Sequence, residues 1–421
     1  MAGEAWTECT VDEIKSPTPN ALATGPFGSA IGSRYFADHG VPVIRGGNLS
    51  QDVGVRLSDD GLVFVSDEKA REFSRSLARR GDLVFTCWGT IDQVGLVDDR
   101  SRFPEYVVSN KQMKLTPDPR KASSLFLYYL FSSPLVRDRI LNQGIGSSVP
   151  GFNLGQLRSI RLNLPALPEQ RAIAHILGTL DDKIELNRRM NETLEAMARA
   201  LFKSWFVEKV QDGLPKGWRD GTMDELVTLC RDTINPSEFP NETFDHYSIP
   251  AFDEGRLAKA EAGEQILSNK FLVPSNAIMI SKLNPRIPRV WFPQISNSSR
   301  SVSSTEFLVA VAKHGISREW LYGLYSSDAF LDEFATFVTG TSGSHQRVKP
   351  EYLLAMGVDI PPEERITGFT ALAKPLHDRI ALNRTESRTL AALRDTLLPN
   401  LISGELRVQD VETVSTTHHE R

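Results

Sequence analysis

The chain has 421 residues, enough to bury two cores of ordinary domain size. Apolar residues make up 40% of the chain and charged residues 24%, a composition typical of a soluble globular protein and not of a disordered one. The net charge of −5 argues against indiscriminate binding of nucleic acid by the whole surface.

The cysteines, the first residues and the apolar runs indicate the compartment in which the protein works. Cys9, Cys87 and Cys230 lie far apart, so neither a disulfide framework nor a Cys-x-x-Cys metal site is indicated, and a reducing cytoplasm is the expected compartment. The first residues lack the basic start and apolar core of a signal peptide. No apolar run approaches the ~18 residues that span a membrane.

The first globular segment is predicted to be mixed α/β. Residues 83–86 and 94–97 have the apolar, β-branched character of strands and flank a turn at 87–90. A helix is predicted around 125–141, and a Gly/Ser loop follows at 144–148.

A long helix comes next. Pro168 suits the first turn of a helix, and Glu169 suits the positive end of its dipole. From Leu180 the seam advances in steps of four and three residues, which predicts a coiled coil over about 181–206. The seam residues that we single out here are Leu180, Ile184, Asn187, Leu194 and Leu201.

The second half repeats this order. Residues 277–280 and 290–292 are predicted strands around a turn at 282–286, a helix is predicted around 320–337, and a Gly/Ser loop follows at 340–347. The closing helix carries the seam residues Leu376, Ile380, Asn383, Leu390 and Leu397, each 196 positions after a residue of the first seam.

The repeat extends through both globular segments. Trp6 recurs as Trp218, 212 positions later, whereas Leu127 and Tyr128 recur 194 positions later as Leu321 and Tyr322. A shared framework with divergent loops is typical of a scaffold that presents two different binding surfaces.

Two features of the helices allow more than one interpretation. Asn187 and Asn383 either fix the register of the seam or lie at its solvated edge. The helices either join two chains or, more simply, pair with each other. Antiparallel pairing predicts two globular domains separated by the helix pair and related by a pseudo-two-fold axis.

Candidate DNA contacts lie in the turns and loops. Residues 20–165 hold 18 Lys/Arg against 14 Asp/Glu, and residues 268–350 hold 9 against 5, so each window has a net charge of +4. Arg and Asn make bidentate contacts to bases, and Gly/Ser loops contact phosphates, although ordinary turns have the same composition. The candidates are Arg45, Asn48, Trp88, Lys111, Ser147, Ser148, Lys282, Asn284, Arg286, Thr341, His345 and Arg347.

These motifs together resemble the specificity subunit of type I restriction-modification enzymes. The resemblance rests on the Pro-Glu-Gln-Arg opening at 168–171, the Ile-x-Leu-Asn-Arg stretches at 184–188 and 380–384, and the motifs at 25–29 and 41–48, and it covers residues 1–408. The second helix departs from it, with Pro-Pro-Glu-Glu-Arg at 361–365 and no Gln.

The resemblance implies two target-recognition domains, each reading one half of a bipartite sequence in double-stranded DNA, with the helices setting the spacer between the halves. It also implies two docked methyltransferase subunits, and endonuclease subunits that join for cleavage. S-adenosylmethionine, ATP and Mg would be bound by those partners and none by this chain.

The missing motifs agree with a recognition subunit that performs no chemistry. No Asn/Asp-Pro-Pro-Tyr/Phe stretch, no phosphate-binding Gly-x-x-x-x-Gly-Lys-Ser/Thr loop and no His-x-x-x-His metal pair occurs in the sequence. A self-sufficient methyltransferase or nuclease is therefore disfavoured. A coiled-coil scaffold that joins proteins without reading DNA remains the alternative.

The predicted organisation has five parts: a first recognition domain at 1–165, a central spacer helix at 166–212, a second recognition domain at 213–361, a C-terminal spacer helix at 362–408 and a polar tail at 409–421.

Overall fold

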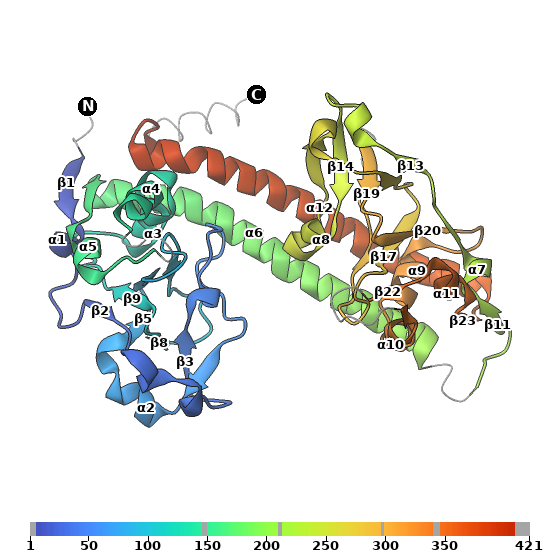
Figure 1. Ribbon diagram of the computed structural model, residues 1–421, viewed down its shortest axis with the longest axis horizontal. Coiled ribbons are helices and arrows are strands. Elements are labelled where there is room, and N and C mark those ends of the chain that lie inside the picture. The colour runs from blue at the N-terminus through green and yellow to red at the C-terminus, as the bar shows by residue number, and fades with distance from the viewer. Residues whose placement is uncertain (1–5, 145–149, 209–212, 296–298, 340–345, 409–421) are drawn as a thin grey trace. The chain divides into compact units, whose positions relative to one another are not determined.

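The structure is a computed structural model that describes residues 6–144, 150–208, 213–295, 299–339 and 346–408. The chain divides into two compact units: unit 1 is Met1–Glu185 with Ser387–Arg421, and unit 2 is Leu186–Glu386. Each unit contains part of both long helices, α6 (Leu167–Phe202) and α12 (Glu363–Ser403), which Figure 1 labels. The predicted boundaries of the five parts stay a prediction.

Unit 1 is mixed α/β, as predicted, and is built on three small sheets with the orders β1-β10, β2-β9-β6-β7 and β4-β3-β8-β5. The strands are β1 (Thr7–Thr10), β2 (Leu22–Thr24), β3 (Val41–Ile44), β4 (Val63–Val65), β5 (Leu77–Arg79), β6 (Leu83–Thr86), β7 (Val94–Leu96), β8 (Glu105–Val108), β9 (Gln112–Leu115) and β10 (Arg161–Leu164). The α-helices before α6 are α1 (Val11–Ile14), α2 (Asp67–Glu72), α3 (Ser124–Ser132), α4 (Pro134–Gln143) and α5 (Leu154–Ser159).

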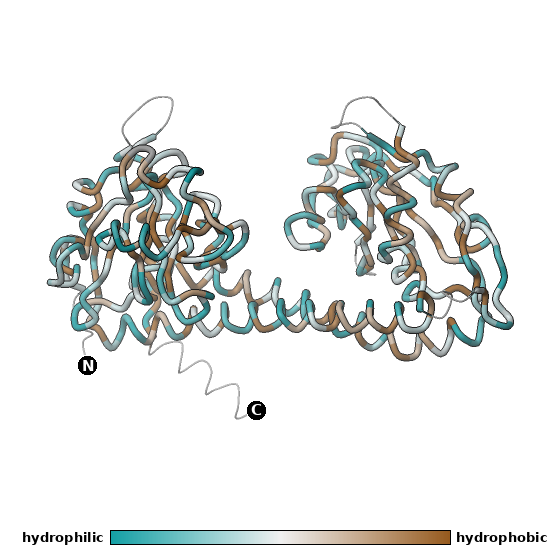
Figure 2. The backbone as a smooth tube through the Cα atoms, turned by 90° about the horizontal axis from the view of Figure 1, so that it is seen from below, coloured by the Kyte–Doolittle hydropathy of each residue, from teal (hydrophilic) through white to brown (hydrophobic). Residues whose placement is uncertain are grey.

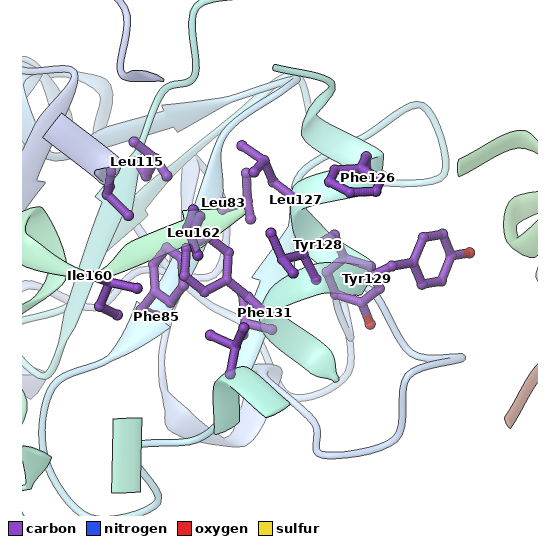
Figure 3. Packing of buried hydrophobic residues seen from close by; sticks show 14 of the residues in the cluster. Leu83, Phe85, Leu115, Phe126, Leu127, Tyr128, Tyr129, Phe131, Ile160 and Leu162 are labelled. Carbon is purple, nitrogen blue, oxygen red and sulfur yellow. The ribbon is translucent and has the colours of Figure 1, made fainter. Parts of the chain in front are cut away.

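The main core of unit 1 lies between the β2-β9-β6-β7 sheet and α3. All four residues of β6 are buried, which explains why its sequence is a continuous apolar run. Phe85 of β6 meets Phe131 of α3 edge to face at 4.9 Å between ring centroids, and Figure 3 shows this packing.

The helix predicted around 125–141 is two helices, α3 and α4, and this prediction was wrong. Ser133 between them has an extended backbone, and its hydroxyl donates to the carbonyl of Leu130 at 2.6 Å. Pro134 then begins α4, because proline has no N–H and its ring clashes with the preceding turn. The same break separates α9 (Arg318–Tyr325) from α10 (Asp328–Thr336) at Ser327, although no proline follows it.

Unit 2 is also mixed α/β, with sheet orders β11-β23, β12-β20-β17-β18, β13-β16-β19-β14-β15 and β21-β22. Its strands are β11 (Arg219–Thr222), β12 (Val227–Leu229), β13 (Thr233–Ile234), β14 (Thr243–Tyr247), β15 (Lys259–Ala262), β16 (Lys270–Leu272), β17 (Ala277–Ser281), β18 (Val290–Trp291), β19 (Arg300–Ser303), β20 (Phe307–Ala312), β21 (Val338–Thr339), β22 (Arg347–Val348) and β23 (Gly357–Ile360). The remaining helices are α7 (Met223–Leu226), α8 (Ile249–Gly255) and α11 (Pro350–Ala355).

The two units share one strand topology, which confirms the internal repeat. In unit 1, β3 pairs antiparallel with β4 and parallel with β8, and β8 pairs antiparallel with β5. In unit 2, β14 pairs antiparallel with β15 and parallel with β19, and β19 pairs antiparallel with β16. The all-antiparallel sheets β2-β9-β6-β7 and β12-β20-β17-β18 correspond in the same way.

In each unit the segments of α6 and α12 run antiparallel. Unit 1 pairs Glu169 with Arg407 and Asp181 with Arg394, whereas in unit 2 Arg365 donates to the backbone of Trp205. None of the predicted seam residues is exposed, and Asn187, Ile380 and Asn383 are buried. Figure 2 shows hydrophobic and hydrophilic residues alternating along the paired helices.

The two seam asparagines are inside the helix pair. Asn187 and Asn383 are 0% and 1% exposed, which excludes a solvated position at the edge of the seam. The Asn187 amide donates to the Asn383 carbonyl at 3.4 Å and to Glu386 at 2.8 Å, and the Asn383 amide donates to Asn191 at 2.9 Å. Each amide therefore has a defined partner on the facing helix, as in a seam whose register is fixed by a polar residue.

Candidate nucleic-acid interface

One edge of the β2-β9-β6-β7 sheet gathers several loops of unit 1. Because neighbouring strands are antiparallel, the segments that follow β2 and β6 and the turn that precedes β9 lie at the same edge. We call the segments 25–27, 87–93 and 109–111 the first loop edge. Backbone hydrogen bonds hold these segments together at the start of β9. The Gly25 N–H donates to the carbonyl of Gln112 at 3.0 Å, and the Cys87 N–H donates to the carbonyl of Lys111 at 2.6 Å.

The corresponding edge of the β12-β20-β17-β18 sheet gathers the loops of unit 2. We call the segments 230–232, 282–289 and 304–306 the second loop edge. Lys282 donates to the carbonyl of Glu306 at 2.9 Å, the counterpart of the bond between Cys87 and Lys111. In each unit, the segment that precedes the last short helix also contacts the loop edge. The Phe152 N–H donates to the carbonyl of Cys87 in unit 1, and the Val348 N–H donates to the carbonyl of Lys282 in unit 2.

The turn after the central strand has the same backbone shape in both units. Gly89 and Asn284 occupy equivalent positions, and both adopt the left-handed conformation with φ of 93° and 48°. Glycine adopts this conformation without strain, and asparagine tolerates it better than most residues. The repeated backbone therefore presents different side chains on one common turn.

The first loop edge exposes aromatic side chains beside a cation. Trp88 is 55% exposed, and its ring lies over Gly151, where an added Cβ would come within 2.6 Å of it. Lys111 is exposed on the neighbouring turn. Phe27, which the sequence interpretation missed, is 78% exposed. The predicted contacts Ser147 and Ser148 lie outside the described residues.

The second loop edge carries cations at the equivalent turn. Arg286 is exposed, whereas Lys282 and Asn284 are half-buried. Arg347 lies beside the same turn and is held by two contacts of 2.9 Å to the carboxylate of Glu306. The predicted contacts Thr341 and His345 lie outside the described residues.

Arg45 and Asn48 lie next to the first loop edge, because Ser109 donates to the carbonyl of Ile44 at 3.0 Å. Asn48 is only 2% exposed, and its amide donates to the carbonyls of Ser58 and Asp60, both at 3.0 Å. Its oxygen accepts from the backbone of Arg45. The geometry thus gives Asn48 a structural role in the turn and removes the basis for a base contact by its side chain.

No catalytic arrangement is found at the loop edges in the part of the chain that the structure describes. Burial raises the pKa of the Cys87 thiol to about 12, so this thiol stays protonated near neutral pH and is a poor nucleophile. No cluster of three His, Cys, Asp or Glu residues able to hold a metal ion occurs among the described residues. Within the same ranges, no helix has the length and apolar character needed to cross a bilayer.

The long helices expose apolar side chains at repeated positions. Leu186 and Met197 of α6 are 52% and 49% exposed, and Leu382 and Leu393, each 196 positions later on α12, are 63% and 46% exposed. Positions eleven apart lie on one face of an α-helix. Each helix therefore exposes two apolar side chains on one face, at positions that correspond through the internal repeat.

Comparison with known proteins finds one family of similar sequences. The family model described as the type I restriction modification DNA specificity domain matches residues 37–196. The type I restriction enzyme MjaIX specificity subunit of Methanocaldococcus jannaschii is 24% identical over 375 residues, which cover 82% of each chain. This chain is similar to type I specificity subunits over most of its length. This similarity favours a specificity function over a coiled-coil scaffold.

Further relatives agree with this similarity. The HindI specificity subunit of Haemophilus influenzae is 38% identical over 105 residues, 24% of this chain and 23% of that protein. The crystal structure of the type I restriction-modification S subunit from M. genitalium matches with a TM-score of 0.61 at 15% identity, covering 95% of this chain and 97% of that one. At this identity, the structural match shows the shared fold of a specificity subunit.

Proposed function

We propose that each unit of this specificity subunit reads one half of a bipartite DNA sequence with its loop edge. The observation that carries the proposal is the repeated turn at Gly89 and Asn284, where one backbone shape presents Trp88 in unit 1 and Lys282 with Arg286 in unit 2. Exposed cations bind phosphates and base edges, and an exposed aromatic side chain can make apolar contact with a thymine methyl group in the major groove. Different side chains on one framework would give two different half-sites.

The helix pair would set the unspecified spacer between the half-sites, since α6 and α12 each contribute to both units. The chain itself would be non-catalytic and cytoplasmic. S-adenosylmethionine would be bound by methyltransferase subunits, and ATP with Mg by endonuclease subunits where these are present.

Mapping methylated adenines tests the proposed function. Genomic DNA from cells that carry this chain with its methyltransferase partner is expected to show methylation at one bipartite sequence with a fixed spacer. Cells with the partner alone should lack this methylation. A single uninterrupted recognition sequence would contradict the assignment of one half-site to each unit.

Replacing Arg286 with alanine is expected to weaken binding of the target DNA by ~1–3 kcal/mol if its guanidinium makes a bidentate base contact. Lys282→Ala tests the neighbouring cation in the same way. Arg289→Ala is the matched control, because Arg289 is on the same turn but its guanidinium is bound to Asp253 at 2.8 and 2.9 Å. Unchanged affinity in both Arg286→Ala and Lys282→Ala would mean that this turn is not the reading loop.

The exposed apolar residues that recur on α6 and α12 would dock two methyltransferase subunits. Leu186→Glu and Leu382→Glu are each expected to remove one copy of the partner from the complex, because each places a charge in one copy of an apolar contact. The native mass of the purified complex measures the number of copies. Lys374→Glu, at an exposed position on another face of α12, serves as the control and should keep both copies. Two bound copies in both leucine variants would place the docking surface elsewhere.

A further inference from the structure

A buried carboxylate on α6 joins three parts of unit 1. The side chain of Asp181 is 0% exposed. Its oxygens contact the guanidinium of Arg394 on α12 at 2.9 Å and the hydroxyl of Tyr129 on α3 at 2.5 Å. Arg56, from the loop that precedes β4, makes its closest ion pair with Asp98 at 2.7 Å, lies 4.0 Å from the Asp181 carboxylate and donates to the Tyr129 hydroxyl at 3.3 Å. One acid therefore connects the globular part of unit 1 with both helices.

A second carboxylate on α6 has the same kind of partners in unit 2. Glu195 is 14% exposed at its side chain, and it contacts Arg384 of α12 at 2.8 Å and Arg256 at 3.1 Å. Arg256 ends α8 in the left-handed conformation, and its carbonyl accepts from the indole of Trp291 at 3.1 Å, which fixes its backbone. In both units, then, an arginine of the globular part and an arginine of α12 share one carboxylate of α6.

The two links are not copies made by the internal repeat. The residue 196 positions after Asp181 is His377, and the residue 196 positions before Arg394 is Ala198. Glu195 likewise corresponds to Ala391. A link inherited from the common framework would occupy equivalent positions in both units. The two units therefore reach the same arrangement with residues at different positions.

We propose that Asp181 and Glu195 are positioning residues that fix each recognition domain on the helix pair and thereby restrict the spacer length that the complex accepts. This inference rests on the proposed function. A carboxylate bound to a guanidinium of α12 and lying beside an arginine of the globular part resists rotation of one element against the others, since rotation would separate these charges. A neutral amide keeps the size of the side chain but loses the charge, so the domain can tilt and its loop edge can reach a half-site at another spacing.

The test uses the full complex with the methyltransferase and DNA targets that differ only in spacer length. Asp181→Asn and Glu195→Gln are each expected to raise methylation of targets one base pair longer or shorter by about tenfold relative to the wild-type spacer, a factor that corresponds to 1.4 kcal/mol. The sequences of the two half-sites should stay the same. Asp378→Asn, which breaks an exposed pair with Lys374 on α12, is the matched control and should keep the wild-type spacer profile.

The outcomes separate this inference from the proposed function. If the wild-type complex methylates no bipartite target, the proposed function fails. If it does, but the variants methylate every spacer in the wild-type ratio, the positioning role is refuted even where total activity falls. Glu195→Gln provides an independent test at the less buried link if Asp181→Asn does not fold.

Discussion

Arg394→Ala is expected to lower the free energy of unfolding by about 3–5 kcal/mol, because it leaves the buried carboxylate of Asp181 without its closest cation. Arg394 is 5% exposed, and its guanidinium contacts Asp181 at 2.9 Å and Asp395 at 2.8 Å. Burial alone would lower the pKa of Arg394, but the hydrogen bonds to these carboxylates raise it overall. Denaturant unfolding of the complete chain measures the loss.

The control for Arg394→Ala separates a buried pair from an exposed one. Lys374→Ala removes an exposed pair on the same helix and should cost no more than about 1 kcal/mol. Replacing Asp181 and Arg394 together with leucine should be far less destabilising than Arg394→Ala, since no charge is then left unpaired. A loss below 1 kcal/mol in Arg394→Ala would show that the pair does not hold α12 against unit 1.

His377 is expected to make the stability of unit 2 dependent on pH. The imidazole stacks on Phe292 at 4.6 Å between ring centroids, and Tyr322 packs against it edge-on. Burial is the main cause that lowers the pKa of His377 from 6.5 to about 4, with Arg318 and Arg384 lowering it further and Glu195 and Asp378 opposing them. The side chain is therefore neutral in the folded protein at neutral pH.

The direction of this pH dependence follows from proton linkage. Between pH 6.5 and 4 the unfolded chain binds a proton at His377 that the folded chain does not, so stability is complete above pH 6.5 and decreases as the pH falls. The loss amounts to roughly 3 kcal/mol at pH 4. His377→Phe keeps an aromatic stack and should remove this contribution. Equal loss of stability between pH 7.5 and 4.5 in the wild type and in His377→Phe would contradict the assignment.

The sequence alone predicts the framework because the framework repeats. The apolar run at 83–86 and its counterpart at 277–280 correspond to the buried strands β6 and β17, and the step of four and three residues from Leu180 corresponds to a helix seam. These signals are local, since periodicity and burial are written into consecutive residues. The break between α3 and α4 was missed, although Pro134 is the local signal that could have found it.

The links between helices and globular parts could not be predicted in the same way. Asp181 and Arg394 are 213 residues apart, and Arg56 approaches them from a loop with no motif. The one signal was an arginine in the seam at 394, where the other copy has Ala198, since a charge in a seam requires a partner. Asn48 shows the opposite error, because composition cannot tell a turn residue that binds a ligand from one that binds its own backbone.

The most direct test of two independent readers is the exchange of residues 20–160 for the matching part of a relative with another target. The methylated adenines in cells that carry the exchanged chain and the methyltransferase partner are then mapped. One half of the bipartite sequence is expected to change, while the other half and the spacer stay the same. A change in both halves, or in neither, would contradict the assignment of one half-site to each unit.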